Sequence, residues 1–248
     1  MKISATLITL NEEKNLARAL DSLRCCDEIV VVDSGSRDRT VEIAEGYGAR
    51  VVHREFQGYT DQKNFAAQSS QHDWVLSLDA DEALSPALEE ELRLLKTGTA
   101  RFDAYSFPRR AHYLGRWIRH SGWYPDRKVR LYDRRKGCWM GDYVHESVKV
   151  LGKVGRLRGD LLHYTCDTFS SHIQTVDRYT TLAAKEIVAS GEQSGWGGLL
   201  LAPPWAFFRT YGLKRGFLDG WQGLVIAVMA AFYVFARNLK TKTMSSAG

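Results

Sequence analysis

Short apolar runs alternate with helical patterns over roughly the first 97 residues of this 248-residue chain. The apolar runs predict strands over residues 3–10, 28–32, 49–53 and 74–78. The segments between them predict helices over about residues 16–23, 40–45 and 61–69, the first of them capped by Asn11. Strands that alternate with helices form a parallel sheet covered by those helices. The sequence therefore predicts an α/β domain.

The composition fits one sizeable globular domain with additions, or two small domains. Hydrophobic residues make up 44% of the chain and charged residues 25%, which excludes a disordered protein. The 34 basic and 29 acidic residues leave a net charge of +5, too modest to indicate a nucleic-acid-binding protein. Four cysteines without metal-ligand spacing, and an N-terminus without a signal-peptide pattern, predict reduced thiols and a cytoplasmic location.

Polar side chains collect where the predicted strands end. They are Thr9, Asn11, Glu12, Asp33, Asp79 and Asp81. Ligands of open α/β sheets bind at the carboxyl ends of the strands. Each of these residue types is also common in caps and turns for local reasons. Three such clusters at strand ends nevertheless favour a binding site.

The last of these clusters directly follows the apolar run of residues 74–78. It contains three acidic residues, Asp79, Asp81 and Glu82. Fixed carboxylates at a strand end suit a hard divalent cation that bridges phosphate groups. The alternative is a solvated turn followed by the acidic first turn of a helix. The chain has no GxGxxG after the first strand and no GxxxxGK[ST], so the phosphate-binding loops of dinucleotide enzymes and P-loop ATPases are missing.

Four motifs carry a family resemblance: LITLNEE, VVDSGSRDRT, DQKNFA and LDADE, in this order. Together they resemble the inverting family 2 glycosyltransferases, whose GT-A fold is a Rossmann-like mixed sheet. The runs VHESV, GDLLHYT and GFLDGWQGLVIAVMAAFYVFAR are similar to a bacterial subgroup that glycosylates the inner core of lipopolysaccharide. The resemblance implies a UDP-sugar donor and a divalent cation, Mg²⁺ or Mn²⁺.

The resemblance also assigns residues to these ligands. It implies that the nucleotide sugar is held by Thr9, Glu12, Asp33, Lys63 and Asp79, with Lys63 closing over the base. It implies a metal held most directly by Asp81, with Asp79 and His163 as further ligands. A lone histidine such as His163 is also common as a structural hydrogen-bonding residue.

An acceptor hydroxyl needs a general base, and the family commonly uses the acid of a Glu-Asp pair. This chain instead has His145-Glu146, so Glu146 is the predicted base, with Asp142 as the fallback. In a strand, Glu146 would share an apolar face with two valines. That position is unfavourable for a charged side chain that has neither a partner nor a function. Gly122, Trp123 and His145 are predicted to lie on the acceptor side, although Trp123 also suits a core.

Arginines crowd the middle of the chain among aromatic residues. They are Arg109, Arg110, Arg116, Arg119, Arg127, Arg130, Arg134 and Arg135. This combination suits single-stranded nucleic acid, a phosphorylated glycolipid or an ordinary solvated face. The upstream motifs favour an anionic glycolipid acceptor and no nucleic-acid partner.

The chain changes character after residue 167, and we predict a glycosyltransferase domain over residues 1–167 and a helical extension over 168–248. A helix is expected over residues 170–190, followed by apolar stretches. Residues 221–236 carry no charge, but these 16 residues are fewer than the roughly 20 of a membrane span. Six basic residues against one acidic residue after position 202 favour a helix lying on anionic headgroups. An apolar core or dimerisation helix is the alternative.

The sequence thus predicts an enzyme at the inner face of the bacterial inner membrane. It would transfer a sugar with inversion, glucose and a core heptose being the expected donor sugar and acceptor by resemblance. Alternatives are a polyprenyl-phosphate glycosyltransferase, whose phosphate acceptor needs little help from a base, and a non-catalytic sugar-nucleotide or membrane-binding module.

Overall fold

The computed structural model describes residues 1–141, 146–166, 168–192 and 195–246. The chain forms two compact units. The sheet unit comprises Met1–Arg109 and Asp126–His163, and the helical unit comprises Arg110–Pro125 and Tyr164–Gly248. The grouping differs from the predicted ranges chiefly because residues 110–125, here called the insertion, belong with the C-terminal helices; they comprise the end of β6 (Ala104–Tyr113) and the segment that leads to β8 (Asp126–Asp133).

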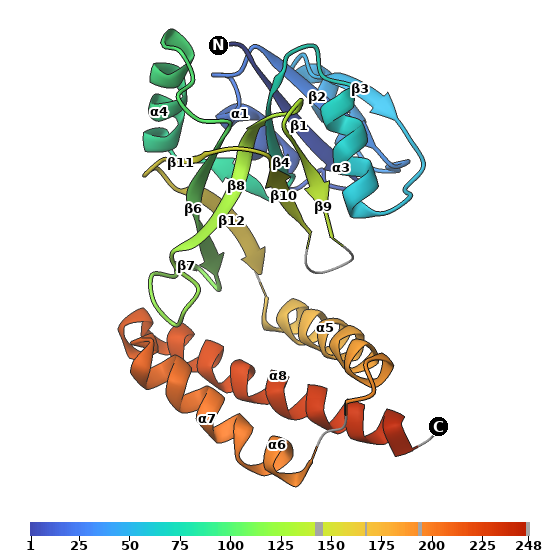
Figure 1. Ribbon diagram of the computed structural model, residues 1–248, viewed down its shortest axis with the longest axis vertical. Coiled ribbons are helices and arrows are strands. Elements are labelled where there is room, and N and C mark those ends of the chain that lie inside the picture. Colours follow the sequence, from blue (N-terminus) through green and yellow to red (C-terminus); the bar gives the residue numbers. More distant parts are fainter. Residues whose placement is uncertain (142–145, 167, 193–194, 247–248) are drawn as a thin grey trace. The chain divides into compact units, whose positions relative to one another are not determined.

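A mixed sheet with the strand order β3-β2-β1-β4-β8-β6-β12-β5 forms the framework of the sheet unit (Figure 1). These strands are β1 (Ile3–Thr9), β2 (Glu28–Asp33), β3 (Arg50–His53), β4 (Trp74–Asp79), β5 (Glu82–Leu84), β6 (Ala104–Tyr113), β8 (Asp126–Asp133) and β12 (Leu161–Cys166). Strands β1 to β4 are parallel, whereas β8 runs antiparallel to β4 and β6. The predicted parallel strands and mixed α/β sheet are confirmed.

Two short strands and a separate hairpin complete the β-structure of the described residues. Strands β7 (Arg116–Trp117) and β11 (Val154–Arg156) both pair with β6. Strands β9 (Gly137–Met140) and β10 (Ser147–Val150) form a two-stranded antiparallel sheet.

Alternation along the parallel strands divides the core between the two faces of the sheet. Ile3, Ala5 and Leu7 of β1 pack with α1 (Leu16–Ser22), α2 (Thr40–Gly46) and α4 (Pro86–Thr97). On the other face, Val30 and Val32 pack with α3 (Tyr59–Gln68), and Val75 packs with the β9–β10 hairpin. Both faces are covered, as expected for parallel strands with apolar sequences.

The loop after β1 departs from the prediction, because Asn11 does not cap the first helix. Helix α1 begins only at Leu16, and Asn11 adopts a left-handed φ of 56°. Its Oδ1 instead accepts a hydrogen bond of 2.9 Å from the backbone N–H of Arg37. Asn11 therefore joins the loops that follow β1 and β2, a contact that helix spacing alone could not reveal.

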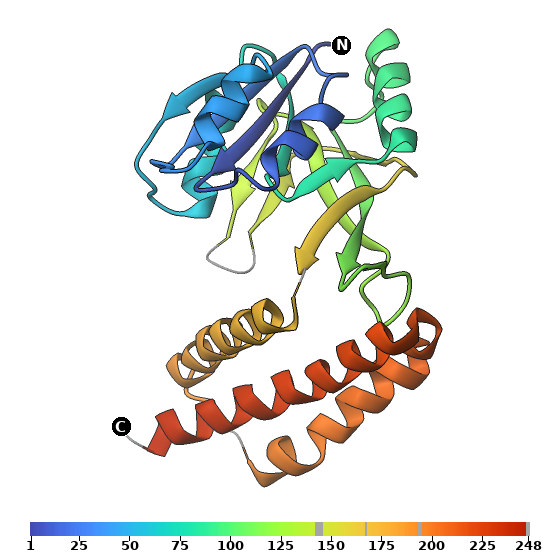
Figure 2. The same cartoon turned by 180° about the vertical axis from the view of Figure 1, so that it is seen from behind.

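The helical unit contains three longer helical segments, two of which pack along the third, C-terminal one (Figure 2). Helix α5 (Phe169–Ala189) confirms the helix predicted over residues 170–190. Helices α6 (Trp196–Leu200) and α7 (Ala202–Phe208) lead through a π-helical turn (Arg209–Leu213) and a 3₁₀ turn (Gly216–Asp219) into α8 (Gly220–Ser246). Within the described chain, the stretch Gly216–Ser245 is long and apolar enough to cross a membrane.

The buried carboxylate of Asp219 joins the start of α8 to the insertion. It accepts hydrogen bonds from the backbone N–H groups of Arg119 and His120, at 3.0 and 2.9 Å, and from Ser121 Oγ at 3.1 Å. These bonds satisfy a carboxylate whose residue is only 1% exposed. They explain why residues 110–125 group with the helices.

Gly159 packs closely against α4 within the sheet unit, so a substitution there tests this contact. A Cβ atom at Gly159 would lie 2.4 Å from the backbone N and Cα of Leu88, neither of which can rotate away. We expect Gly159→Ala to lower the free energy of unfolding by about 1–3 kcal/mol, because overpacking forces backbone shifts. Gly98→Ala is the control, since its Cβ would meet nothing within 4 Å. Equal urea midpoints for the two variants would contradict this account.

Candidate active site

Strand register brings the predicted polar residues to one edge of the sheet. Thr9 lies opposite Asp33 across the β1–β2 pair, and Ile8 lies opposite Asp79 across the β1–β4 pair. The carboxyl ends of three parallel strands therefore meet at the same level, where α/β sheets bind their ligands.

Asp33 holds the turn that follows β2. Its carboxylate accepts hydrogen bonds from the N–H groups of Gly35 and Ser36, at 2.9 and 2.8 Å, and from Thr9 Oγ1 at 3.0 Å. Burial alone would raise the pKa of Asp33, but these bonds and one from the Ser36 hydroxyl hold that pKa below its ordinary value. The ionised carboxylate thus fixes the turn, and direct contact of Thr9 and Asp33 with a nucleotide stays a prediction.

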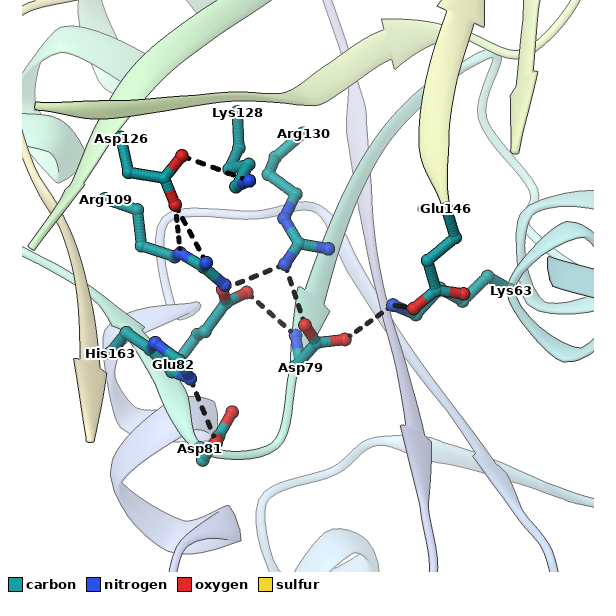
Figure 3. Close-up of polar contacts among 10 residues, drawn as sticks. All are labelled: Lys63, Asp79, Asp81, Glu82, Arg109, Asp126, Lys128, Arg130, Glu146 and His163. Carbon is teal, nitrogen blue, oxygen red and sulfur yellow. Dashed lines mark hydrogen bonds and ion pairs between the residues drawn. The ribbon is translucent and has the colours of Figure 1, made fainter. Parts of the chain in front are cut away.

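Eight charged side chains of alternating sign form a chain of ion pairs across the sheet edge (Figure 3). In order, they are Glu146, Lys63, Asp79, Arg130, Glu82, Arg109, Asp126 and Lys128. The successive nitrogen–oxygen distances are 3.0, 2.9, 2.7, 2.8, 3.4, 2.8 and 3.1 Å. Four carboxylates meet four cations, so this ion-pair chain is neutral.

Asp79 and Arg130 lie at the centre of the ion-pair chain. Burial would raise the pKa of Asp79, but attraction to Arg130 and Lys63 outweighs it and holds that pKa well below the usual range. Burial would likewise lower the pKa of Arg130, yet Asp79 and Glu82 raise it above its ordinary value. Both groups therefore stay charged at neutral pH.

Helix α3 supplies Lys63 and fixes its surroundings through the DQKNFA motif. The Lys63 side chain is 4% exposed and its Nζ lies 4.3 Å from the centre of the Trp139 ring. Asn64 clamps the backbone of Trp139, accepting from its N–H at 2.8 Å and donating to its carbonyl at 2.9 Å. Lys63 was predicted to close over a nucleotide base, whereas the structure places its ammonium group between two carboxylates.

Glu146, the predicted base, lies directly before β10. Its Oε1 pairs with Lys63, and its buried Oε2 has no hydrogen-bond partner among the described residues. One oxygen is thus fixed and the other is available to accept a proton. Asp142 and His145 lie outside the described residues.

A second pair of predicted residues meets between the turn after β4 and the middle of β12. Asp81 Oδ2 lies 3.2 Å from His163 Nε2, and Figure 3 shows Asp81 turned toward His163 while Asp79 is turned toward Arg130 and Lys63. Burial raises the pKa of Glu12, and repulsion from Asp81 and Asp79 adds to this rise despite a hydrogen bond from Asn15. Glu12 therefore lies within electrostatic reach of both Asp81 and Asp79.

The donor set at Asp81 and His163 fits a divalent cation that shares its coordination with a substrate. The described residues contain no group of three or more His, Cys, Asp or Glu side chains arranged to hold a metal. Mg²⁺ characteristically takes one or two carboxylates and completes its shell with phosphate oxygens and water, and Mn²⁺ also prefers oxygen ligands. The Asp79 carboxylate already pairs with the side chains of Lys63 and Arg130. Its role as a metal ligand stays a prediction.

Several arginines of the middle region form contacts within the fold, and the role of this region in binding an anionic acceptor stays a prediction. Arg109 and Arg130 belong to the ion-pair chain. Arg127 donates to the carbonyls of Ser106 and Leu157. Arg134 donates to carbonyls at the end of α3, and Arg135 pairs with Asp73 and Asp133.

Gly122 and Trp123 lie in the helical unit. Gly122 has a φ of 78°, and a Cβ there would meet the side chain of Lys214. The Trp123 ring packs edge-on against Tyr113, with 5.3 Å between ring centres. Their part in binding an acceptor stays a prediction.

Comparison with known proteins identifies the family. The model of the family described as glycosyl transferase family 2 matches residues 4–148, more than half of the chain. The chain belongs to glycosyl transferase family 2. The matched range contains the ion-pair chain, Asp81 and most of the sheet unit.

Relatives of this family 2 glycosyltransferase match along nearly its whole length. The lipopolysaccharide core biosynthesis glycosyltransferase LpsC of Rhizobium meliloti is 33% identical over 252 residues, covering 96% of this chain and 93% of the relative. An uncharacterized glycosyltransferase of Rickettsia typhi is 31% identical over 256 residues, covering 98% and 88%. The crystal structure of S. aureus TarS shares the fold, with a TM-score of 0.51 at 16% identity, over 100% of this chain and 55% of that one.

Arg130, Glu82 and Trp139 are site residues to which the sequence analysis assigned no individual role. Glu82 was visible as the third acidic residue of its cluster, yet its partner Arg130 lies 48 positions away. A signal was present in β8, where Arg130 adjoins the apolar pair Leu131 and Tyr132. A charge buried in an apolar strand requires a partner.

Arg130 should be the side chain on which the ion-pair chain most depends. We expect Arg130→Met to lower the free energy of unfolding by about 3 kcal/mol or more, because Glu82 would lose its closest buried partner. Arg24→Met is the matched control, since Arg24 pairs with Asp21 at 2.9 Å on the exposed surface, where a pair contributes at most about 1 kcal/mol. Urea denaturation of both variants tests this, and equal losses would contradict it.

The pKa of Asp79 predicts an acid-dependent contribution to stability. Because the folded-state pKa lies below the ordinary value, the unfolded chain binds more protons over the interval between the two values. The contribution is complete above about pH 4 and is lost as the pH falls through the folded-state pKa. The stability difference between the parent protein and Asp79→Asn should therefore shrink on acidification. Urea denaturation at a series of pH values measures it, and a constant difference would count against the assignment.

Proposed function

We propose that this glycosyltransferase inverts the anomeric configuration while moving a sugar, expected to be glucose, from a UDP-sugar to a membrane glycolipid. The expected acceptor is a heptose of the lipopolysaccharide inner core. The similarity to LpsC supports a role in lipopolysaccharide core biosynthesis. The observation that carries the chemistry is the placement of Glu146 and the Asp81–His163 pair on either side of Asp79 along one sheet edge.

Asp81 and His163 would hold the divalent cation, Mg²⁺ or Mn²⁺. When bound there, such an ion neutralises charge on the diphosphate leaving group. Lys63 and Arg130 keep Asp79 ionised and fixed, so that its carboxylate has a defined place beside the donor. Thr9, Glu12 and Asp33 shape the adjoining loops for the nucleotide.

Glu146 would take the proton of the acceptor hydroxyl. Lys63 fixes Oε1 of this carboxylate, which leaves Oε2 to receive the proton as the new glycosidic bond forms. The hydroxyl attacks the anomeric carbon from the face opposite the diphosphate, so a single displacement inverts the configuration. No covalent enzyme intermediate is needed.

The helical unit would associate with the cytoplasmic face of the inner membrane. Large apolar side chains are exposed on it, including Trp205, Phe208 and Trp221. Polar contacts hold both ends of α8, at Asp219 and at Lys240, which pairs with Asp177 of α5 at 2.7 Å. A spanning helix would place these two ends on opposite sides of the bilayer. Contacts of both ends within one unit favour a helix lying on the leaflet.

Two variants separate donor binding from proton removal. We expect Asp81→Asn to abolish the dependence of UDP affinity on Mn²⁺, as chelation by EDTA should in the parent protein. Glu146→Gln should keep UDP-glucose affinity and lose about 100-fold or more in transfer rate, because general base catalysis is removed. Calorimetry measures the UDP and UDP-glucose affinities, and an assay with lipid extracts measures the transfer rate. Glu45→Gln, at an exposed position, is the control.

Other results would redirect the proposal. Near-normal transfer by Glu146→Gln would favour a polyprenyl-phosphate acceptor. Binding of GDP-mannose in place of UDP species would overturn the donor. Absence of both binding and transfer in the parent protein would indicate a non-catalytic module.

A further inference from the structure

A cavity of about 330 Å³ lies within the helical unit, between α5, α7 and α8. Half of its twelve lining residues are aliphatic, and these are Val176, Ala206, Ile226, Met229, Ala230 and Val234. The α8 residues recur at helical spacing, so one face of that helix lines the cavity. The volume falls in the range of sites that bind small ligands.

Three aromatic residues also line the cavity, namely Trp123, His172 and Tyr233. His172 Nδ1 is 2.6 Å from the hydroxyl of Tyr113. Burial lowers the pKa of His172, so its imidazole is neutral at pH 7. This part of the lining therefore carries no charge and suits an apolar group.

Two cations, Arg209 and Lys214, also line the cavity and are exposed to solvent, which places their charges at its mouth. Neither forms an ion pair with any residue that the structure describes. The nearby acids are already engaged, Asp219 by the insertion and Asp177 by Lys240. The Lys214 side chain also lies against Gly122, where a Cβ would overlap it, so the ammonium group has a defined position.

Exposed apolar side chains continue outward from these cations. Phe208 precedes Arg209 and is 53% exposed, and Leu213 precedes Lys214 and is 60% exposed. Cations flanked by exposed apolar residues are typical of surfaces that lie among lipid headgroups. An apolar cavity that opens at such a surface is suited to a molecule with a hydrocarbon chain and an anionic head.

We propose that this cavity binds one acyl chain of an anionic membrane phospholipid, with the phosphate of its head group on Arg209 and Lys214. The bound lipid would anchor the helical unit to the leaflet. The insertion would respond to it, because Trp123 lines the cavity and Gly122 contacts Lys214. The inference rests on the membrane association proposed above and is independent of the donor chemistry.

Calorimetric titration of the full chain with decyl phosphate, below its micellar concentration, tests the site. We expect saturable binding to one site, and affinity for inorganic phosphate or decyl maltoside lower by about tenfold or more, since each lacks half of the recognised chemistry. Equal affinity for inorganic phosphate would overturn the acyl-chain site. Equal affinity for decyl maltoside would overturn the role of the cations.

Variants locate the binding. Arg209→Gln with Lys214→Gln should weaken decyl phosphate binding about tenfold or more, because charge-assisted hydrogen bonds are lost. Arg178→Gln with Lys185→Gln removes the same charge from exposed positions on α5 and should leave the affinity unchanged. An equal loss in both double variants would show attraction to net charge alone and overturn the site.

Filling the cavity provides a second, independent variant. Ala230→Phe should weaken decyl phosphate binding and leave the weak attraction of inorganic phosphate unchanged, with melting temperature as the check on folding. Unchanged decyl phosphate affinity in a folded Ala230→Phe protein would overturn the proposal. UDP binding and sugar transfer are measured separately, so failure of the donor assignment would leave this result intact.

Discussion

The ion pairs of Arg130 with Asp79 and Glu82 are the constraint on which the sheet unit depends. Glu82 is fully buried, and a buried carboxylate is tolerated only where cations and hydrogen bonds compensate the loss of water. Arg130 supplies that compensation and at the same time holds Asp79 at the carboxyl end of β4. Three strands, β4, β5 and β8, must therefore keep their relative positions for the charges to remain satisfied. The candidate site inherits its geometry from this requirement.

Much of this fold could be predicted because its signals are local. The apolar runs of β1, β2 and β4 and their polar ends lie within single short segments, so the sheet and the positions of Asp33, Asp79 and Asp81 follow from them. The pairing of Arg130 with Glu82 could not follow, because it joins residues 48 positions apart on strands whose register no local pattern specifies. The same limit explains why Asn11 was wrongly predicted to cap a helix. Its hydrogen-bond partner, the backbone N–H of Arg37, lies in a different loop.

The residues of the sequence motifs stabilise the fold as well as forming the candidate site. In DQKNFA, Gln62 donates to Ser34 and to the carbonyl of Arg54, which secures the turn after β2. The next residue, Lys63, belongs to the ion-pair chain, and Asn64 clamps Trp139 beneath it. Three consecutive side chains of α3 thus reach three different elements. A resemblance based on such motifs identifies the fold reliably, whereas the role of each residue needs the three-dimensional arrangement.

The ion-pair chain also passes the point where the insertion leaves the sheet unit. Arg109 is the last residue before residues 110–125 and Asp126 is the first after them, and their side chains pair at 2.8 Å. Arg109 contacts Glu82 as well, and Glu82 shares Arg130 with Asp79. Within the sheet unit, Asp126 and Arg109 are therefore joined to Asp79 through Glu82 and Arg130.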